Sequence, residues 1–281
     1  QIERIEFPVN ARCTSRAYGD PEYVEAAIKI LQAAKRPVVM AGSSVWLCRG
    51  QDALRRFVEE ADVPVYLNGM GRGCIPPDHP NFFSHTRGFA LDSCDVAIVI
   101  GTPLDFRLGY GKSIPETAKI IQIDIDPLDI GQNRSADVGI AGDVGVILDQ
   151  LARALPEIAG PREGRRHRAW LEQIRHTEEK ALERLAPQLV SDLQPIHPNR
   201  FSAELKKFLD RNTIIVGDGG DIVAIASKVL DVHLPGNWLD PGPLGCLGVG
   251  MPFAIAAKLA RPDKRVMVLF GDGSFGLTGF E

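Results

Sequence analysis

Short apolar runs that alternate with helical segments restrict the fold of this chain more than any other feature. Val38–Ala41, Asp95–Ile100 and Lys119–Asp124 are almost wholly apolar, and the shorter run Pro64–Leu67 lies between the first two. Strands that are covered on both faces have this character. Because strands separated by helices form parallel sheets, the pattern predicts an α/β fold with a doubly wound parallel sheet.

Helical periodicity fills the intervals between these strands. Pro21–Lys35 follows Asp20, a suitable N-cap, and repeats apolar residues along one face. A second helix carries Leu54 and Phe57, and a third spans Val144–Leu155. We therefore assign residues 20–160 to one Rossmann-like domain.

Ligands of doubly wound sheets bind at the carboxyl ends of the strands. In this chain the candidate nucleotide-binding residues at that edge are Gly42, Ser43, Arg107, Asp124, Ile125 and Asp143. A carboxylate after a strand can accept hydrogen bonds from ribose hydroxyls, and Arg107 can pair with a phosphate. A surface ion pair is the alternative for Arg107. We assign no special role to His85 and Arg87.

A change in composition separates this domain from a second α/β unit. Pro156–Arg168 combines prolines, glycines and a basic cluster, which is typical of a solvated linker, and a polar helix follows to about Ala186. Asn199 can cap the next helix, and the strand Thr213–Val216 follows. The expected organisation is a linker from a preceding N-terminal domain over 1–19, the middle domain over 20–160, a linker with a helix over 161–198, and a truncated second domain over 199–281.

The second unit ends with the clearest chemical signal, the strand Arg265–Phe270 followed by Gly271-Asp272-Gly273-Ser274. Glycines at such a junction let the backbone approach a diphosphate without hindrance from a Cβ atom. The carboxylate of Asp272 suits Mg²⁺, which prefers oxygen ligands and often bridges protein to phosphate. Gly273 and Ser274 offer backbone donors to that phosphate. Taken alone, Gly-Asp-Gly is also a common turn sequence.

Motifs upstream of this strand connect it to a known family. In chain order they include GTPLDFR at 101–107, IDIDP at 123–127, VGDGG at 216–220 and GPLGCLGVGMP at 242–252. In order and spacing they resemble the thiamine-diphosphate (ThDP)-dependent enzymes of the acetolactate synthase, 2-hydroxyacyl-CoA lyase, oxalyl-CoA decarboxylase and benzaldehyde lyase group. The resemblance covers nearly the whole chain, as the middle domain and the first part of the ThDP-binding domain of that family.

The resemblance implies roles for the residues at matching positions. Asp272 would be a Mg²⁺ ligand, Leu247 would bend the cofactor from beneath, and the backbone of Gly245 would contact the pyrimidine amine; core packing is the alternative for Leu247. The implied cofactor-binding residues are Gly219, Gly220, Asp221, Gly245, Leu247, Gly271, Gly273 and Ser274.

Other parts of the family's active site lie outside this chain. The resemblance implies a catalytic glutamate in an N-terminal domain and a second metal ligand, an asparagine, after Ser274. We therefore expect no catalytic residue in this chain and no activity from it alone. Because the family's active site forms between subunits, a homodimer or homotetramer is also implied.

The resemblance further implies that the parent enzyme makes or breaks carbon–carbon bonds through an acyl-anion equivalent on ThDP. Asp105–Gly111 and Gly217–Asp221 look more like the lyases, which favours a lyase or carboligase acting on 2-hydroxyacyl-CoA, with ADP in the middle domain. The alternative is an acetolactate synthase, a transferase that contains FAD, although Ser84–Ala90 lacks the Gly-Met-His-Gly turn that those enzymes place against FAD. A non-catalytic nucleotide-binding fragment is the alternative from another class.

Composition excludes several further classes. The net charge of −4 provides no basic footprint for nucleic acid or a membrane surface. No apolar run is long enough to span a membrane, and residues 1–10 lack the features of a signal peptide. Five scattered cysteines argue against a zinc site or a disulfide framework. We expect a cytoplasmic protein that acts on a small-molecule or acyl-CoA substrate.

Overall fold

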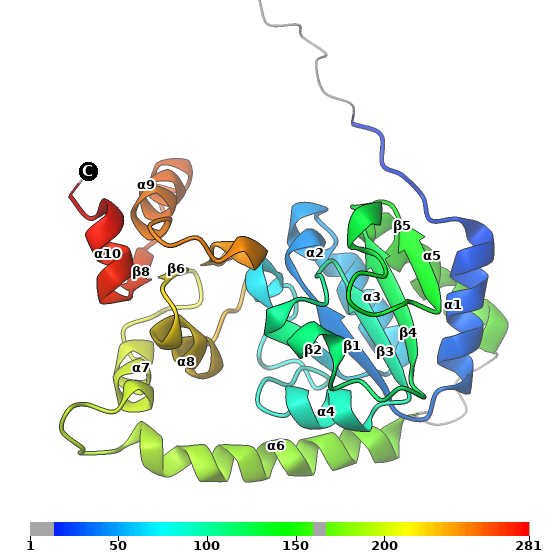
Figure 1. Ribbon diagram of the computed structural model, residues 1–281, viewed down its shortest axis with the longest axis horizontal. Helices are drawn as coiled ribbons and strands as arrows, with labels where there is room; N and C mark the ends of the chain where they lie inside the picture. Colours follow the sequence, from blue (N-terminus) through cyan, green and yellow to red (C-terminus); the bar gives the residue numbers. More distant parts are fainter. Residues whose placement is uncertain (1–13, 160–166, 281) are drawn as a thin grey trace, which may run out of the picture.

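The computed structural model describes residues 14–159 and 167–280 and contains two α/β units joined by a long helix (Figure 1). The first unit is built on a five-stranded parallel sheet with the order β2-β1-β3-β4-β5. Its strands are β1 (Pro37–Ala41), β2 (Val65–Leu67), β3 (Val96–Ile100), β4 (Lys119–Asp124) and β5 (Val138–Ala141). Every residue of β1, β2 and β3 is buried, which explains why these runs are apolar on both faces.

Helices cover both faces of this sheet. One face is packed by α1 (Pro21–Ala33), α3 (Gln51–Ala61) and α5 (Val144–Ala159), through a core that includes Ile28, Phe57 and Leu148. The other face is packed by α4 (Arg87–Ser93) and the start of α6. Four short helices follow strand ends or turns: α2 (Ser43–Leu47), η1 (Gly69–Gly71), η2 (Phe106–Gly111) and η3 (Pro127–Asp129). The expected doubly wound parallel sheet is confirmed.

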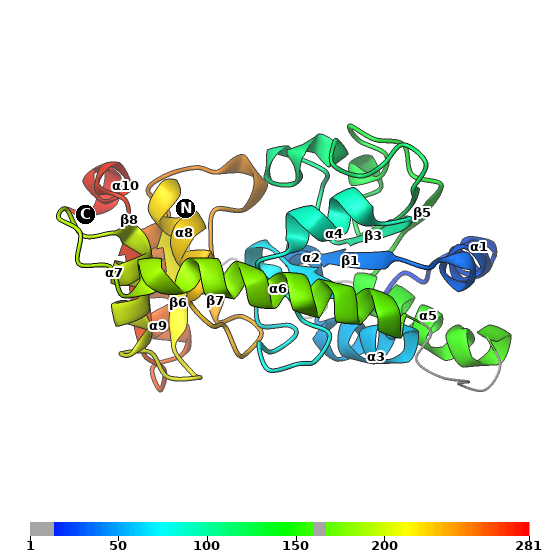
Figure 2. The same ribbon diagram turned by 90° about the horizontal axis from the view of Figure 1, so that it is seen from below.

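Helix α6 (Arg168–Leu189) runs along the underside of the molecule from the first unit to the second (Figure 2). Trp170 and Ile174 are buried in the first unit, and Trp170 Nε1 donates to the carbonyl oxygen of Pro37 at 2.9 Å. One turn further on, the Glu178 carboxylate accepts from the amides of Ser84 (3.0 Å) and His85 (2.9 Å). The helix expected to be a linker therefore also completes the core of the first unit.

The second unit is smaller within the described residues. Its three parallel strands, β6 (Ile214–Asp218), β7 (Trp238–Leu239) and β8 (Val266–Phe270), have the order β7-β6-β8. Helices α7 (Pro198–Lys206) and α8 (Asp221–Val229) pack on one face around Trp238, and α9 (Gly250–Ala260) packs on the other. The short helix η4 (Gly242–Leu244) precedes α9, and the short helix α10 (Asp272–Thr278) follows β8.

Most expected elements are confirmed, and the differences have local causes. The N-cap of α7 is His197 and not Asn199, because Pro198 occupies the first helical position and the His197 ring accepts from the Asn199 amide at 3.1 Å. The short strands β5 and β7 were not expected. Of the expected linkers, residues 1–13 and 160–166 lie outside the described residues. In the described part, no helix is long and apolar enough to cross a membrane.

Candidate functional site

Two glycines bring the carboxyl ends of β6 and β8 into direct contact. Gly271 follows β8, and its amide donates to the carbonyl oxygen of Asp218, the last residue of β6, at 2.8 Å. Gly219 has a φ of +151°, and a Cβ atom on it would lie 2.9 Å from the Gly271 nitrogen. A side chain at 219 would therefore push these strand ends apart. Two of the predicted cofactor residues thus lie side by side.

The residues after Gly271 leave polar groups available at this edge. Asp272 begins α10 with an exposed side chain, and a Cβ atom on Gly273 would meet nothing within 4 Å. Ser274 is only 1% exposed, yet its Oγ has no hydrogen-bond partner among the described residues. Buried hydroxyls nearly always have a partner, so this one indicates a site for a bound polar group.

Asp218 organises the loop that faces these residues, a role that the sequence analysis missed. Its buried carboxylate accepts from the amides of Gly248 (3.1 Å) and Gly250 (2.7 Å). Thr278 of α10 adds a hydrogen bond to the carbonyl oxygen of Gly248 at 2.9 Å. An aspartate at the end of a buried strand, before two glycines, was the signal that could have revealed this role.

The other predicted cofactor residues lie on exposed backbone around the same edge. Gly220 caps α8, and Asp221 is its first residue. Gly245 has a φ of +64° in the loop between η4 and α9, and a Cβ atom there would meet nothing within 4 Å. Leu247 is 49% exposed, so the described residues cover its side chain only in part. Its role against a cofactor stays a prediction.

The predicted nucleotide residues meet at the carboxyl edge of the first sheet. A Cβ atom on Gly42 would lie 2.7 Å from both Asn68 Oδ1 and the Gly101 carbonyl oxygen, so β1 can meet its neighbours here only through a glycine. Ser43 Oγ accepts from the amide of Met70 at 3.1 Å. The Asp124 side chain is buried at the end of β4, and burial raises the pKa of its carboxyl group.

Asp143 and Ile125 lie near this edge in different settings. The Asp143 carboxylate accepts from Arg16 Nε at 2.8 Å and from the amide of Val146 at 3.1 Å. Burial acts to raise the pKa of Asp143, but the hydrogen bonds from Arg16 and Val146 outweigh burial and lower it. Ile125 is 55% exposed. Asp143 therefore has a structural role as a helix cap and ion-pair partner, and nucleotide contacts by either residue stay predictions.

Arg107 forms the ion pair considered for it, and its contact with a phosphate stays a prediction. Its Nε donates to Asp105 Oδ2 at 2.9 Å and its Nη2 lies 2.8 Å from the same oxygen, so an ion pair is present. The pair is largely buried, with 19% of the Arg107 side chain and 17% of the Asp105 side chain exposed. Such a pair fixes the direction of the guanidinium. Arg107 is therefore held at the mouth of the cleft described next.

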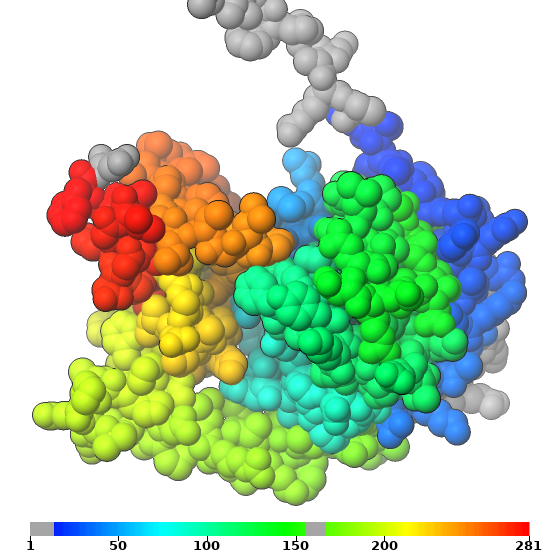
Figure 3. All heavy atoms as spheres, in the orientation of Figure 1, coloured from blue at the N-terminus to red at the C-terminus, as the bar shows by residue number. Residues whose placement is uncertain are grey.

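A cleft of about 1280 Å³ separates the two units and reaches both candidate sites. It is lined by Asn68 and Arg107 of the first unit and by Gly219, Gly220 and Gly245 of the second. Figure 3 shows the surface hollowed between the yellow and orange second unit and the cyan and green first unit. Three predicted cofactor glycines and Arg107 therefore share one space, whereas Gly271–Ser274 and the other predicted nucleotide residues do not line it.

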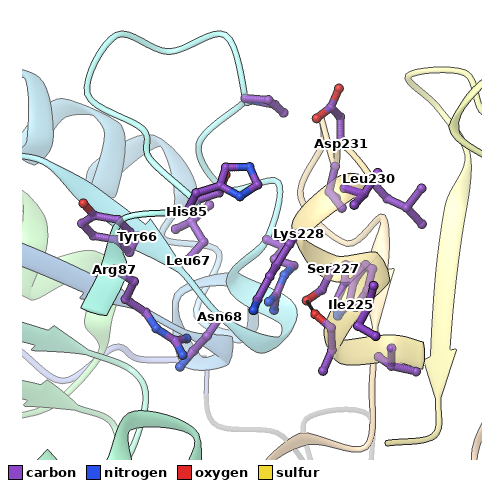
Figure 4. Close-up of a pocket in the computed structure, with 18 of the residues that line it drawn as sticks. Tyr66, Leu67, Asn68, His85, Arg87, Ile225, Ser227, Lys228, Leu230 and Asp231 are labelled. Carbon is purple, nitrogen blue, oxygen red and sulfur yellow. Dashed lines mark hydrogen bonds between the residues drawn. The ribbon is translucent and has the colours of Figure 1, made fainter. Parts of the chain in front are cut away.

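Several residues of this cleft were not recognised from the sequence. His85 and Arg87, assigned no role above, are half-buried in its wall, which the sequence analysis did not foresee. Figure 4 shows Arg87 and His85 on the first unit and Lys228 on α8 facing the same space. These residues come from loops and from two separate units, and no periodic pattern in the sequence links them. Within the described residues no group of three or more His, Cys, Asp or Glu side chains forms a metal site.

Comparisons with known proteins agree with this architecture. Residues 24–151 match the central domain of thiamine pyrophosphate enzymes, and residues 218–281 match their C-terminal TPP-binding domain. The acetolactate synthase large subunit IlvG of Mycobacterium tuberculosis is 42% identical over 259 residues, which cover 92% of this chain and 46% of that protein.

Two further relatives show the breadth of the likeness. The 2-hydroxyacyl-CoA lyase 2 of Homo sapiens is 35% identical over 270 residues, which cover 93% of this chain and 41% of that protein. A probable acetolactate synthase large subunit of Methanocaldococcus jannaschii is 33% identical over 300 aligned positions, which cover 100% of this chain and 49% of that protein. The chain spans about half the length of the curated relatives that it matches.

Proposed function

This chain belongs to the thiamine pyrophosphate-dependent enzymes, and we propose that the whole protein uses ThDP and Mg²⁺ to break or form carbon–carbon bonds next to a carbonyl group. The unpartnered Ser274 hydroxyl beside the contact of Gly219 with Gly271 is the observation that carries the proposal. A diphosphate at this edge would give that hydroxyl the acceptor that it lacks.

The residues at the ends of β6 and β8 fit a bound diphosphate. Gly219, Gly220 and Gly273 leave the backbone free of side chains, so phosphate oxygens can approach the amides. The exposed carboxylate of Asp272 would hold the Mg²⁺ that bridges protein and diphosphate. Bound ThDP supplies the electron sink for the reaction, and these residues hold and orient it.

The loop 242–250 supports the other end of the cofactor in this proposal. The Asp218 carboxylate fixes the loop through the amides of Gly248 and Gly250. Fixing those two residues limits the positions open to Leu247, whose exposed side chain can then contact an apolar ring. A homo-oligomer is part of the proposal, because α9 and α10 leave apolar side chains such as Leu259 and Leu277 exposed.

Substitutions at this edge test cofactor binding directly. Ser274→Ala removes only the hydroxyl and should raise the Kd for ThDP about tenfold, because a hydrogen bond to a charged group contributes about 1.5–3 kcal/mol. Asp272→Asn should raise the Mg²⁺ concentration needed for ThDP to bind. The matched control is Thr177→Val, because the Thr177 hydroxyl donates to the Gln173 carbonyl oxygen on the exposed side of α6, outside the cleft. Unchanged calorimetric titrations of both site variants would refute the proposed site.

For the substrate, we propose 2-hydroxyacyl-CoA, which the protein would cleave or form. The lyase-like segments Asp105–Gly111 and Gly217–Asp221 support this, and so does the excess of basic side chains in the cleft, which suits a polyanionic acyl-CoA. The second candidate is acetolactate formation, which the 42% identity to a mycobacterial acetolactate synthase favours. Assays of the whole protein with 2-hydroxyacyl-CoA and with pyruvate separate the two, since only the first forms an aldehyde and an acyl-CoA.

We also propose that the first unit binds an adenine nucleotide at Gly42, Ser43, Arg107 and Asp124. The glycine-only contact at the end of β1 and the buried Asp124 carboxylate support this. The test is to denature the purified whole protein and identify the released molecules by mass spectrometry and absorbance. ADP would support the lyase branch, FAD would support acetolactate synthase, and no adenine nucleotide would refute this part of the proposal.

A further inference from the structure

The stretch 241–247, here called the cofactor loop, has few contacts of its own. Leu244 is 87% exposed, Leu247 is 49% exposed, and a Cβ atom on Gly245 would meet nothing within 4 Å. A segment with so few packed side chains takes its position from the residues that hold its two ends. At the far end, the Asp218 carboxylate holds the chain through the hydrogen bonds described above.

Asp240 anchors the near end of the cofactor loop. Its Oδ1 accepts from the amide of Gly242 at 3.0 Å, and its Oδ2 accepts from Trp238 Nε1 at 2.9 Å. Gly242 begins η4 with a φ of +67°, a backbone conformation that residues with side chains disfavour. Because both carboxylate oxygens are engaged, the position of the Trp238 ring determines where Asp240 holds the loop.

The first unit reaches this anchor through Arg72. The Arg72 guanidinium lies over the ring of Trp238, with Cζ 5.1 Å from the ring centre. Trp238 is 1% exposed, and the attraction between a cation and an aromatic ring is stronger when the pair is withdrawn from water. A Cβ atom on Gly69 of η1 would lie 3.9 Å from Asp240 Oδ1, so the two units meet at this anchor. Figure 1 shows the orange chain before α9 beside the cyan turn of the first unit.

Electrostatic attraction adds to this contact between the units. Burial lowers the pKa of Arg72, Asp240 raises it, and Arg87 and Arg107 lower it further. The resulting pKa of about 10 keeps Arg72 protonated at neutral pH. Arg72 and Asp240 therefore attract each other across the boundary, which favours the arrangement with the guanidinium over the indole ring.

We propose that Arg72 of the first unit is a positioning residue for the cofactor loop of the second, and that it acts through Trp238 and Asp240. A loop that is in place before the cofactor arrives binds it more tightly, because ordering the loop on binding costs free energy. The proposal rests on the ThDP site proposed above and adds a residue of the first unit to it. The loop is then ready for the cofactor only while the two units are packed together.

Hydrogen exchange in the cofactor-free whole protein tests the positioning without any bound ligand. Arg72→Met keeps much of the side-chain length and removes the charge, and it should speed exchange in 242–247 about tenfold. The matched control is Arg211→Met, because Arg211 Nη2 lies 3.7 Å from Asp78 Oδ2 across the same boundary, at an exposed place. Arg211→Met should change exchange in 242–247 less than twofold. Arg72→Gln replaces Arg72→Met if the latter does not fold.

Calorimetric titration of ThDP, with Mg²⁺ in excess, tests the route through Asp240. Arg72→Met and Asp240→Asn should each raise the Kd for ThDP about tenfold. Because both act through one chain of contacts, the double variant should be no weaker than the weaker single variant. Arg72→Lys keeps a cation over the ring and should stay within about threefold of the unsubstituted protein.

The outcomes separate this proposal from the cofactor proposal. Unchanged exchange in 242–247 with Arg72 substituted, or an equal rise with Arg211→Met, would overturn the positioning role. Losses of ThDP affinity that multiply in the double variant would overturn the route through Asp240, because independent structural effects are additive in free energy. Failure of the unsubstituted protein to bind ThDP would refute the cofactor proposal alone, and the exchange experiment would still decide whether Arg72 holds the loop.

Discussion

The two units share an α/β architecture but differ in how completely their strands and helices are buried. Every residue of β1 and β3 is buried, whereas in β8 only Leu269 is buried. Helix α3 places all its apolar residues on the sheet, whereas α9 is apolar on nearly all sides and leaves Ile255 (52%) and Leu259 (78%) exposed. Helices that are apolar all round normally lie inside a protein.

The difference shows where each unit obtains its stability. The first unit closes its core with its own helices and the start of α6, so its contacts are satisfied within this chain. The second unit presents an apolar surface over α9 and α10 of the kind that packs against further protein. We therefore expect the first unit to be the more stable and the second to depend more on what covers it.

The largest difference between the two units should appear in the reactivity of their cysteine thiols. Burial raises the pKa of Cys74 in the first unit to about 12, so at pH 8 only about one thiol in 10⁴ is ionised. Cys246 in the second unit is exposed. Under native conditions iodoacetamide should alkylate Cys246 at least about 1000-fold faster than Cys74, as measured by peptide mass spectrometry. Comparable rates would show that the first unit opens readily, which would reverse the comparison.

Removing the central side chain of the second unit should have the next largest effect. Trp238 is 1% exposed, and Trp238→Ala should lower the free energy of unfolding by about 3–5 kcal/mol. Hydrogen exchange should then show loss of protection in β6 and β8 while β1 and β3 keep theirs. Phe57→Ala is the counterpart in the first unit and should give the opposite pattern. Simultaneous loss in all four strands would show that the units unfold together.

A backbone contact between the units gives a smaller effect. Gly73 has a φ of +87°, and a Cβ atom there would collide with the carbonyl oxygen of Leu234 in the second unit. Gly73→Ala should lower the free energy of unfolding by about 2–4 kcal/mol, from backbone strain and steric overlap. Gly88→Ala is the control, because a Cβ atom on Gly88 meets nothing in α4 and should be neutral or slightly stabilising. If Gly73→Ala had the same melting temperature as the unsubstituted protein, the contact between the units would contribute nothing to stability.

The smallest effect tests local electrostatics inside the first unit. The folded-state pKa of Asp143 lies below its unfolded value, so its stabilisation is present above the unfolded pKa and is lost as the pH falls through the folded pKa. Asp143→Asn should cost about 1 kcal/mol at pH 7, and the cost should shrink below pH 4. The pKa of Asp124 is raised, so Asp124→Asn should cost nothing at pH 7 or stabilise the protein. Urea unfolding at pH 3 and pH 7 measures both, and a pH-independent cost for Asp143→Asn would contradict this account.

The sheet of the first unit was predictable because burial on both faces leaves a direct mark on the sequence. Val96–Ile100 is wholly apolar, and its strand was found almost to the residue. Trp238–Leu239 forms a strand of only two residues, too short for any periodicity, and it was missed. The cap of α7 was misassigned because propensity favours asparagine, while the position of Pro198 decides the matter.

The candidate site was predictable only where it follows a motif. Gly271–Ser274 were predicted because a diphosphate requires a bare backbone at a strand end, and glycine is the residue that provides it. Gly219 was predicted only from the family resemblance, and the structure brings it against Gly271. Arg72 and Trp238 were missed because they meet only when the two units pack together. Neither residue belongs to a motif that marks a binding site, so only the three-dimensional structure shows that they are in contact.

Helix α6 has a consequence for how such a chain can evolve. Its 22 residues, about 33 Å long, carry Glu178 on the first unit and Gln188, which accepts from Asn199 Nδ2 at 2.6 Å at the start of the second. One residue inserted between Glu178 and Gln188 would rotate the rest of the helix by about 100° around its axis. Four inserted residues would nearly restore the direction of the Gln188 side chain and would lengthen the helix by about 6 Å. Insertions in α6 that keep both contacts should therefore come in whole helical turns, and a relative with a wider cleft and both contacts should have a longer helix by such a step.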